Sequence, residues 1–356
     1  MYIHKMYLTS SGVRTMAYDY AKAMAKAMKE SLQPAIEQPA APPNYTHCFR
    51  DLAVMRDSSR LVVRRFGLKN LNRRCYANAS IQLLRSFPPV HNYFLHKFTT
   101  TDIKPDSSAT TEKELSLLRS QKGVLLALRK TFLMLQFQLL PSIGPWQISE
   151  LMAATEKVTQ EFVSGKDEQA NRFTLFLIDV CNNCLDIKLF KDLNVTDSVE
   201  STCSNCNNVN FKTGVVEGVY PFHANETKTT LPAIFLNNKS IVTGKKCGNC
   251  LKKYDQDLIY RVYPDKWFFF TVAQLRDVYG NPNPQKITIP SEIFGFNDKH
   301  YQIVSFQMYT ALHYVNVQMI NTEWVLFDDR KVETTTLDAI NEKEEYYPCE
   351  FLCRRV

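Results

Sequence analysis

Among the residues of this chain that can do chemistry, one cysteine stands apart from the others. Cys75 follows the segment GLKNLNRR and precedes YANASIQLLRSF, whose apolar residues repeat at helical spacing. A cysteine at the start of a helix lies near unpaired N–H groups and the positive end of the helix dipole, which stabilise a thiolate. Cys75 is therefore a candidate nucleophile, although a lone cysteine is more often a buried core residue.

A nucleophilic thiolate needs an imidazole and a group that orients it, and the C-terminal part of the chain offers both. His313 opens the run HYVNVQMI, and Asp328 closes the run EWVLFD. The residues between these runs, Asn321 and Thr322, favour a turn. Two strands joined there would bring the imidazole and the carboxylate to the same end of a hairpin.

Three C-x-x-C pairs indicate metal binding, because two such pairs supply the four thiolates of a tetrahedral zinc site. The pairs are Cys181/Cys184, Cys203/Cys206 and Cys247/Cys250. The second and third pairs lie in turn-forming sequences, CSNCNN and CGNC, about 40 residues apart. The first pair continues the apolar face of a predicted helix, where cysteine acts as a small hydrophobic residue.

We therefore expect zinc at Cys203, Cys206, Cys247 and Cys250. The alternative combines the first pair with the second. Four thiolate ligands leave no open coordination position, so the metal would be structural and not catalytic.

Elements of two kinds must hold these residues. Between residues 61 and about 190, apolar side chains recur at i, i+3 and i+4, which predicts a mostly helical lobe. The predicted helices are 76–87, 113–139, 148–157 and 169–185. From residue 195 onward, short β-branched and aromatic runs separated by Asn, Gly and Pro predict a β-rich lobe. The predicted strands are 257–262, 266–272, 286–289, 301–308, 313–320 and 323–327.

Residues 13–43, within the N-terminal region 1–60, offer no candidate reactive group. Helical spacing over 13–32 is followed by a proline-containing tract over 34–43. We expect an N-terminal helical arm and a linker, which either pack loosely on the main body or serve as a targeting or partner-binding helix.

Composition excludes several classes of protein. The chain has 356 residues, of which 45% are hydrophobic and 22% charged, as in ordinary globular proteins. Its net charge of +7 is too small to indicate nucleic-acid binding. It contains no apolar stretch long enough to span a membrane and no secretory signal. We therefore expect a monomer in a reducing compartment, the cytoplasm or the nucleus.

Two distant segments resemble the motifs of one enzyme family. GLKNLNRRCYANASIQLL is similar to the cysteine box of the ubiquitin-specific proteases, G-L-x-N-L-G-N-T-C-Y-M-N-S, and HYVNVQMINTEWVLFDDRKV is similar to their histidine box. Between them, DEQANRFTLFLIDV, LFKDLNVTDSVESTCSNC and CGNC stand where the family has further features. The resemblance runs from about Phe66 to the C-terminus.

The resemblance implies an α+β, papain-like cysteine protease fold that is shaped like an open hand. Its catalytic domain would occupy residues 61–356, with a helical thumb over about 61–190 and a β-rich palm over about 263–356. Zinc-binding fingers over about 195–262 would grip ubiquitin.

The resemblance also implies roles for individual residues. Cys75 would be the nucleophile, His313 the general base and then acid, and Asp328 the group that orients the imidazole, with Asp329 as a second candidate. Asn70 matches the asparagine of the oxyanion hole. The implied reaction is thiol-dependent hydrolysis of the isopeptide bond after the C-terminal glycine of ubiquitin.

The chain departs from the family motif around the nucleophile. Asn72 replaces a glycine, which asparagine can do at a positive φ. Arg73 and Arg74 replace Asn and Thr or Ser, and we expect them to favour the thiolate and to alter the entrance to the site. Leu312 replaces the glycine before the histidine and is expected to narrow the channel.

A further departure concerns substrate recognition. Gln169 and Arg172 stand where the family's acidic residues face the basic tail of ubiquitin, so we expect weaker recognition of that tail, by ~1–3 kcal/mol. The alternatives are a protease for another ubiquitin-like modifier, a catalytically silent ubiquitin-binding scaffold, and a zinc-ribbon protein that binds nucleic acid.

Overall fold

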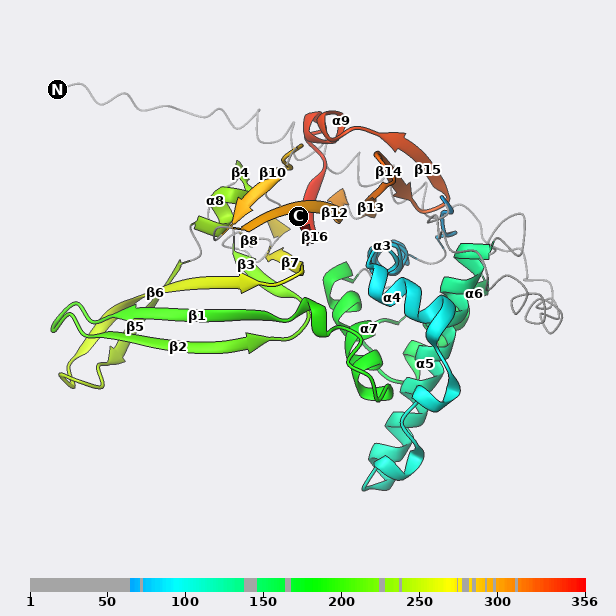
Figure 1. Cartoon of the computed structure of the whole chain (residues 1–356), viewed down its shortest axis with the longest axis horizontal. Helices are drawn as coiled ribbons and strands as arrows, with labels where there is room; N and C mark the ends of the chain where they lie inside the picture. The colour runs from blue at the N-terminus through cyan, green and yellow to red at the C-terminus, as the bar shows by residue number, and fades with distance from the viewer. Residues whose placement is uncertain are drawn as a thin grey trace, which may run out of the picture.

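The computed structural model describes most of the chain from residue 65 onward. The described residues are 65–70, 73–137, 146–163, 168–223, 228–236, 239–273, 275–276, 282–283, 286–291, 293–296, 299–310 and 313–356. The expected N-terminal arm and linker, together with Asn72 and Leu312, lie outside these ranges. Helices gather at one end, a long β-ribbon projects at the other, and a twisted sheet lies between them (Figure 1).

The helical lobe contains the four predicted helices, and their ends differ from the prediction by two residues at most. The long helices are α3 (Cys75–Arg85), α5 (Glu112–Phe137), α6 (Trp146–Glu156) and α7 (Ala170–Cys184). The shorter ones are α4 (Pro88–Asn92), η2 (Tyr93–Lys97), η3 (Thr100–Asp102), η4 (Asp106–Ser108) and η5 (Lys191–Leu193). Among the described residues, no helix is both long and apolar enough to cross a bilayer.

Helix α3 lies at the centre of the molecule. All of its residues are buried, because α7 covers one side and the palm strand β13 (His313–Ile320) covers another. A helix enclosed in this way needs apolar or well-bonded side chains all round. Tyr76 packs edge-on against Phe173 of α7 at a ring distance of 5.5 Å, which anchors the first turn of α3.

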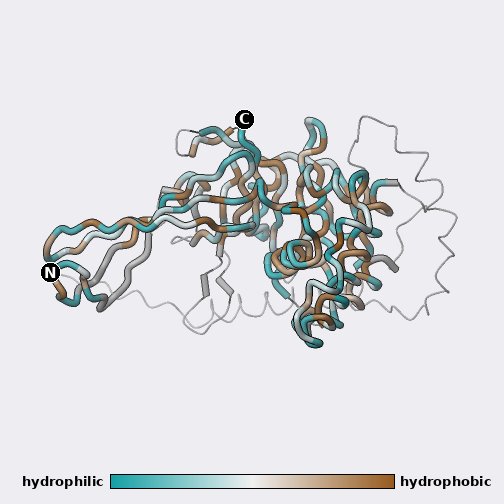
Figure 2. Tube along the Cα trace, turned by 60° about the horizontal axis from the view of Figure 1, so that its bottom comes forward, coloured by the Kyte–Doolittle hydropathy of each residue, from teal (hydrophilic) through white to brown (hydrophobic). Residues whose placement is uncertain are grey.

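The fingers are a four-stranded antiparallel sheet in the order β2-β1-β6-β5. Its strands are β1 (Val195–Thr202), β2 (Val209–Val216), β5 (Lys239–Lys246) and β6 (Lys253–Pro264). Part of β6 was predicted, whereas β2 shows no alternation, because nearly all its residues are exposed. Phe211 is 66% exposed and Val215 is 63% exposed. Figure 2 shows such hydrophobic stretches between hydrophilic ones along the projecting strands.

The palm is an eight-stranded sheet in the order β15-β14-β13-β12-β16-β7-β3, with β11 added beside β12. Besides β13, its strands are β3 (Tyr220–His223), β7 (Trp267–Ala273), β11 (Phe294–Phe296), β12 (Lys299–Thr310), β14 (Glu323–Asp328), β15 (Lys331–Thr335) and β16 (Tyr347–Arg355). Strand β3 joins this sheet although its sequence falls within 195–262. The predicted strands 266–272, 301–308, 313–320 and 323–327 all lie here.

The remaining helices and strands are short. They are α8 (Leu231–Leu236), α9 (Leu337–Glu342), β4 (Lys228–Thr230), β8 (Leu275–Arg276), β9 (Pro282–Asn283) and β10 (Lys286–Thr288). The core of the palm is rich in phenylalanine. The ring centroids of Phe222, Phe268 and Phe270 lie within 6 Å of one another. Large aromatic side chains bury much apolar area each and hold the sheet together.

A buried acid lies where α7 packs on the palm. Glu350 of β16 is fully buried, and its Oε2 lies 3.2 Å from the Thr174 hydroxyl, which also lies 3.1 Å from the Ala170 carbonyl oxygen. That hydroxyl has one hydrogen, so it donates to only one of the two. If it donates to Ala170, a protonated Glu350 completes the bonding by donating to Thr174. Burial raises the pKa of Glu350 to about 8 despite the hydrogen bond from Thr174.

We predict that Glu350→Gln stabilises the protein in alkaline solution. The folded pKa of about 8 exceeds the ordinary value of 4.5, so the contribution of this acid to stability is complete below pH 4.5 and is lost as the pH rises to about 8. The loss is at most about 1.4 kcal/mol per pH unit. Denaturant titrations from pH 5 to 9 should show a smaller fall in the free energy of unfolding for Glu350→Gln than for wild type. The exposed substitution Glu345→Gln serves as a control, and equal slopes in all three proteins would contradict a neutral Glu350.

Candidate functional site

Cys75 is the first residue of α3, as the sequence predicted, and it is buried. The preceding residue, Arg74, provides no side-chain cap for the helix. The N–H groups of the first turn and the helix dipole therefore act near the Cys75 sulfur, where they favour negative charge.

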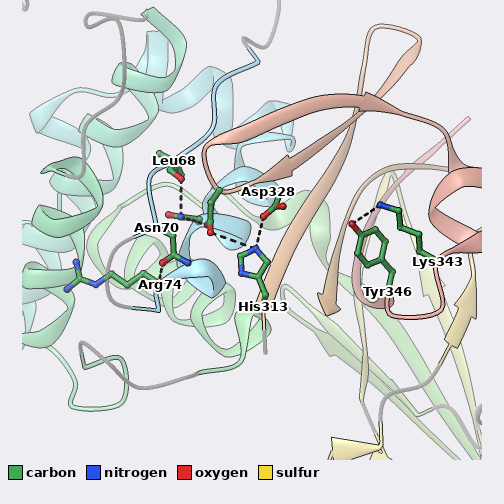
Figure 3. A network of polar contacts seen from close by, with 9 residues as sticks. Leu68, Asn70, Arg74, His313, Asp328, Lys343 and Tyr346 are labelled. Atoms are coloured by element: carbon green, nitrogen blue, oxygen red, sulfur yellow. Dashed lines mark hydrogen bonds and ion pairs between the residues drawn. The ribbon is translucent and has the colours of Figure 1, made fainter. Parts of the chain in front are cut away.

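His313 and Asp328 lie together at one end of the β13–β14 hairpin. Nε2 of His313 is 2.7 Å from Oδ1 of Asp328, and the same nitrogen is 3.7 Å from Oδ2 of Asp329 (Figure 3). The turn that joins the strands contains Asn321 at a φ of 60°, a conformation that asparagine tolerates better than most residues. The predicted hairpin therefore forms with the predicted neighbours.

The imidazole of His313 lies between an acid and the thiol. Burial lowers the pKa of His313, but hydrogen bonds to Asp328 and to Cys75 outweigh it and raise the pKa to about 11. The hydrogen bond from His313 in turn lowers the pKa of Asp328. At neutral pH the arrangement holds an imidazolium beside the sulfur. The structure thus brings Cys75, His313 and Asp328 together.

Asp329 points toward the N-terminal segment and not primarily toward the imidazole. Its Oδ1 accepts a hydrogen bond of 2.7 Å from Nδ2 of Asn78, and Asn70 also hydrogen-bonds to the carboxylate. Burial raises the pKa of Asp329 in spite of these partners and of His313. Of the two candidates, Asp328 makes the shorter contact with His313.

Asn70 lies beside the nucleophile, and its orientation is fixed. Its Oδ1 accepts a hydrogen bond of 2.8 Å from the backbone N–H of Arg74, so its amide nitrogen faces the other way. That nitrogen carries two hydrogens, and the bond to Asp329 uses one.

The first residue of the cysteine box, Gly67, lies against the backbone of another segment. A Cβ atom at this position would lie 2.1 Å from the carbonyl oxygen of Asp329 and 2.8 Å from the backbone of Arg330. The backbone N–H of Leu68 donates to the same Asp329 oxygen at 2.8 Å. The close approach of the two segments therefore excludes any side chain here.

The two arginines before the nucleophile have different surroundings. Arg73 has a φ of 60°, so it is this residue that takes a left-handed conformation in the described part of the box. Arg74 is buried, and its guanidinium reaches Ser149 at 3.4 Å and Glu156 at 3.9 Å, both on α6. Burial lowers the pKa of Arg74, and Glu156 opposes this. Arg74 thus ties the start of α3 to α6.

Gln169 and Arg172 lie at the start of α7, as predicted, but Arg172 already has acidic neighbours. Its Nε is 2.7 Å from Glu161, and a terminal nitrogen is 3.9 Å from Glu168. Gln169 immediately precedes the helix and makes no side-chain cap. The sequence analysis missed Glu161, because this residue lies in a turn outside the family motif.

Four cysteines meet at the tip of the fingers. The sulfur atoms of Cys203, Cys206, Cys247 and Cys250 all lie within 4.8 Å of one another. The Cys203–Cys250 and Cys206–Cys247 sulfur pairs are each 3.8 Å apart. A zinc ion with Zn–S bonds of about 2.3 Å has sulfur atoms about 3.8 Å apart at the corners of its tetrahedron. These thiols therefore fit a zinc ion.

The backbone at the fingertip is built for such a site. Asn207 and Leu251, which follow the second cysteine of each pair, have φ values of 53° and 60°. The backbone N–H groups of Asn249 and Cys250 point at the Cys247 sulfur at 3.3 and 3.5 Å, and these bonds lower the pKa of Cys247 to about 6. Donors to a thiolate favour its charged form, which is the form that binds metal.

The alternative cysteine pairing does not form. Cys181 and Cys184 are buried in the helical core on α7, and burial raises the pKa of Cys184 to about 11. Among the described residues they belong to no group that surrounds a metal position. They pack as small hydrophobic side chains, as their helical spacing indicates.

Comparison with known proteins identifies the family. The sequence profile described as ubiquitin carboxyl-terminal hydrolase matches residues 66–347. The chain belongs to this family. The expected relationship to the ubiquitin-specific proteases is thereby confirmed, as is the enzyme class, a cysteine-type ubiquitin hydrolase. A search of curated protein sequences returned no match.

Solved structures share the fold of this ubiquitin hydrolase. One is the SAGA DUB module of Ubp8, Sgf11, Sus1 and Sgf73 bound to monoubiquitin, with a TM-score of 0.65, 13% identity, and coverage of 88% of this chain and 74% of that chain. Another is the same module bound to ubiquitin aldehyde, with a TM-score of 0.67, 14% identity and the same coverages of 88% and 74%. The expected α+β fold with thumb, palm and fingers is confirmed.

We predict that the wild-type protein contains a metal ion and that Cys206→Ser lacks it and has destabilised fingers, because the substitution takes one of four converging thiolates away. Cys184→Ser is the matched control, since it replaces a buried cysteine outside the cluster. Metal content by mass spectrometry and protease sensitivity between β1 and β6 should separate the two variants. Equal metal loss from both would show that the fingertip cluster is not the metal site.

Proposed function

We propose that this hydrolase cleaves the isopeptide bond after the C-terminal glycine of ubiquitin, with Cys75 as its nucleophile. The observation that supports this most directly is the His313 imidazole, which hydrogen-bonds to both Asp328 and Cys75 in a chain of this family. The two solved relatives are bound to monoubiquitin and to ubiquitin aldehyde, which favours ubiquitin as the substrate here too.

The reaction follows from the protonation of the site. The Cys75 thiolate attacks the carbonyl carbon and forms a C–S bond. His313, which the neighbouring Asp328 and Cys75 keep protonated, gives its proton to the leaving amine as the C–N bond breaks. The neutral imidazole then takes a proton from water, whose oxygen attacks the thioester carbon and forms a C–O bond. The C–S bond breaks, Cys75 leaves as a thiolate beside the protonated imidazole, and ubiquitin is released with a free C-terminal carboxylate. Asp328 orients the ring through both steps.

The negative charge that develops on the carbonyl oxygen needs donors. In this proposal they are the backbone N–H of Cys75 and the second amide hydrogen of Asn70, the one that Asp329 does not take. The bond from the Arg74 N–H to the Asn70 oxygen keeps the amide nitrogen on the correct side. Preorganised donors of this kind lower the barrier without rearranging during the reaction.

The four fingertip cysteines would hold a structural zinc ion. Such an ion supplies a cross-link between the turn after β1 and the turn after β5, with no open position for substrate. In this proposal the proton passes between His313, the leaving amine and water, and none of these groups is a ligand in the fingertip cluster.

The substrate tail would enter past an acidic pair. Glu161 and Glu168 both approach Arg172, which is about half exposed. Basic side chains of a ubiquitin tail would compete with Arg172 for these carboxylates. In this proposal Arg172 weakens tail binding, and a modifier with a less basic tail is the alternative substrate.

The place of action is also a proposal. We propose that the enzyme works as a monomer in the cytoplasm or the nucleus. The compartment is proposed because the described cysteines form no disulfide bonds and a reducing environment keeps a catalytic thiol active.

The function is tested with a ubiquitin probe that carries a thiol-reactive group at its C-terminus. Wild type should form a covalent adduct at Cys75 and hydrolyse a fluorogenic ubiquitin amide, whereas Cys75→Ser should do neither. Probes made from other ubiquitin-like modifiers act as the specificity control. A folded wild-type chain that reacts with no probe would favour the silent scaffold over the enzyme.

We predict that Arg172→Glu lowers KM for the fluorogenic ubiquitin amide by roughly 5- to 100-fold, which corresponds to ~1–3 kcal/mol of tail binding, with kcat little changed. The matched control is Arg119→Glu, an exposed arginine that pairs with Asp106 at 2.8 Å on the thumb. An unchanged KM in Arg172→Glu would show that the tail does not pass this acidic pair.

A further inference from the structure

One buried amide joins three parts of the candidate active site. Asn78 lies one turn after Cys75 on α3 and is 4% exposed. Its Nδ2 donates to Oδ1 of Asp329 at 2.7 Å and to the carbonyl oxygen of Leu68 at 3.3 Å. The helix, the segment before the nucleophile and the turn after β14 thus meet at a single nitrogen atom. Figure 3 draws the bond that reaches Leu68.

The oxygen of the same amide is left without a partner. Oδ1 of Asn78 is buried and accepts no hydrogen bond from the described residues. A buried acceptor without a donor destabilises a fold, and a leucine of similar size would avoid that loss. The reverse amide orientation would point the oxygen at the Asp329 carboxylate, which repulsion disfavours. The hydrogen bonds of the amide nitrogen must therefore explain why this position is an asparagine.

Both acceptors of this amide belong to segments that carry reactive groups. Leu68 lies two residues before Asn70, and Asp329 hydrogen-bonds to Asn70 and lies 3.7 Å from the His313 ring nitrogen. Asn78 itself is on the helix that begins with Cys75. A shift of the amide would therefore change the positions of the oxyanion donor and of the imidazole relative to the sulfur.

We propose that Asn78 is a positioning residue, whose amide nitrogen sets the placement of Asn70 and His313 relative to Cys75 by holding Leu68 and Asp329. This inference rests on the proposed hydrolase function. Asn78 touches no reacting atom in this role. It acts through its two acceptors, and it aligns two segments that are 251 residues apart along the chain.

The first test removes the donor and keeps the size of the side chain. Asn78→Leu in the full chain should lower kcat for a fluorogenic ubiquitin amide by roughly 10- to 100-fold, as expected when reacting groups are misplaced by a fraction of an ångström to one ångström. KM should change less than about twofold, because no substrate contact is lost. Active enzyme is counted by titration with the ubiquitin probe, so that unfolded protein does not enter kcat.

Asn341→Leu is the matched control. The Asn341 side chain also makes two hydrogen bonds: its Oδ1 accepts from the N–H of Ile289 at 3.0 Å and its Nδ2 donates to the carbonyl oxygen of Ile289 at 2.9 Å, but it lies on α9. It should lower the melting temperature and leave kcat unchanged. If kcat per active enzyme falls no further in Asn78→Leu than in Asn341→Leu, Asn78 is structural only and the proposal is wrong.

The second test uses pH. Asn78→Asp places a carboxyl group against the carboxyl group of Asp329. The new side chain can donate a hydrogen bond to Asp329 only while the two carboxyl groups share one proton. The titratable groups that face this pair are His313 and Asp328. The ratio of kcat in Asn78→Asp to kcat in wild type should therefore rise at least fivefold as the pH falls from 8 to 6. A constant ratio across this range would overturn the proposed donor role.

The pH dependence of Cys75 alkylation by iodoacetamide separates this proposal from the proposed function. The reaction reports the thiolate and its imidazole without any ubiquitin. If wild type hydrolyses no ubiquitin substrate, the proposed function is wrong. The profile still decides the role of Asn78, because a changed profile in Asn78→Leu but not in Asn341→Leu supports positioning, and identical profiles contradict it.

Discussion

The docking of the turn after β14 onto the segment before Cys75 is the contact on which the site depends. The Asp329 carbonyl accepts the Leu68 N–H, and Gly67 leaves room for the backbone of the turn. Through this contact, a hairpin near the C-terminus brings His313 to a thiol near residue 75. Helix α3 fixes the position of Cys75, because α7 and β13 enclose this helix. The backbone approach at Gly67 therefore joins the lobe that carries the sulfur to the lobe that carries the imidazole.

Much of this arrangement is predictable from the sequence, since its parts are local. The helix after Cys75, the hairpin that carries His313 and the pairs of fingertip cysteines each have their own short pattern, and the structure places them as expected. The fingers strand β2 was not predictable, because it is exposed on nearly every residue and shows no period. The partners of Asn78 were also missed, since Leu68 and Asp329 come from other segments that only the folded chain brings to it. Glu161, a partner of Arg172, was missed because it lies in a turn outside the family motif.

Several buried polar groups close to the reactive centre lower the stability of the fold. Arg74, Asn78 and Asp329 all lose water on folding, and the ion pairs of the two charged groups are long: Arg74 lies 3.9 Å from Glu156 and Asp329 lies 3.7 Å from His313. Farther away, Glu350 lies among Thr174 and the residues of the palm sheet, where burial favours its neutral form. Such groups fix one geometry better than apolar packing does, and they make the join between thumb and palm sensitive to protonation.

Strand β2 lies at the edge of the fingers sheet, with Phe211 and Val215 facing solvent. An uncovered apolar edge is a template on which a strand from another molecule can add by backbone pairing. Within Val209–Val216 the one charged side chain is Lys212. We therefore expect this single ammonium group to act as the gatekeeper against edge-to-edge association, so that the colloidal behaviour of the purified enzyme depends on a residue far from its chemistry.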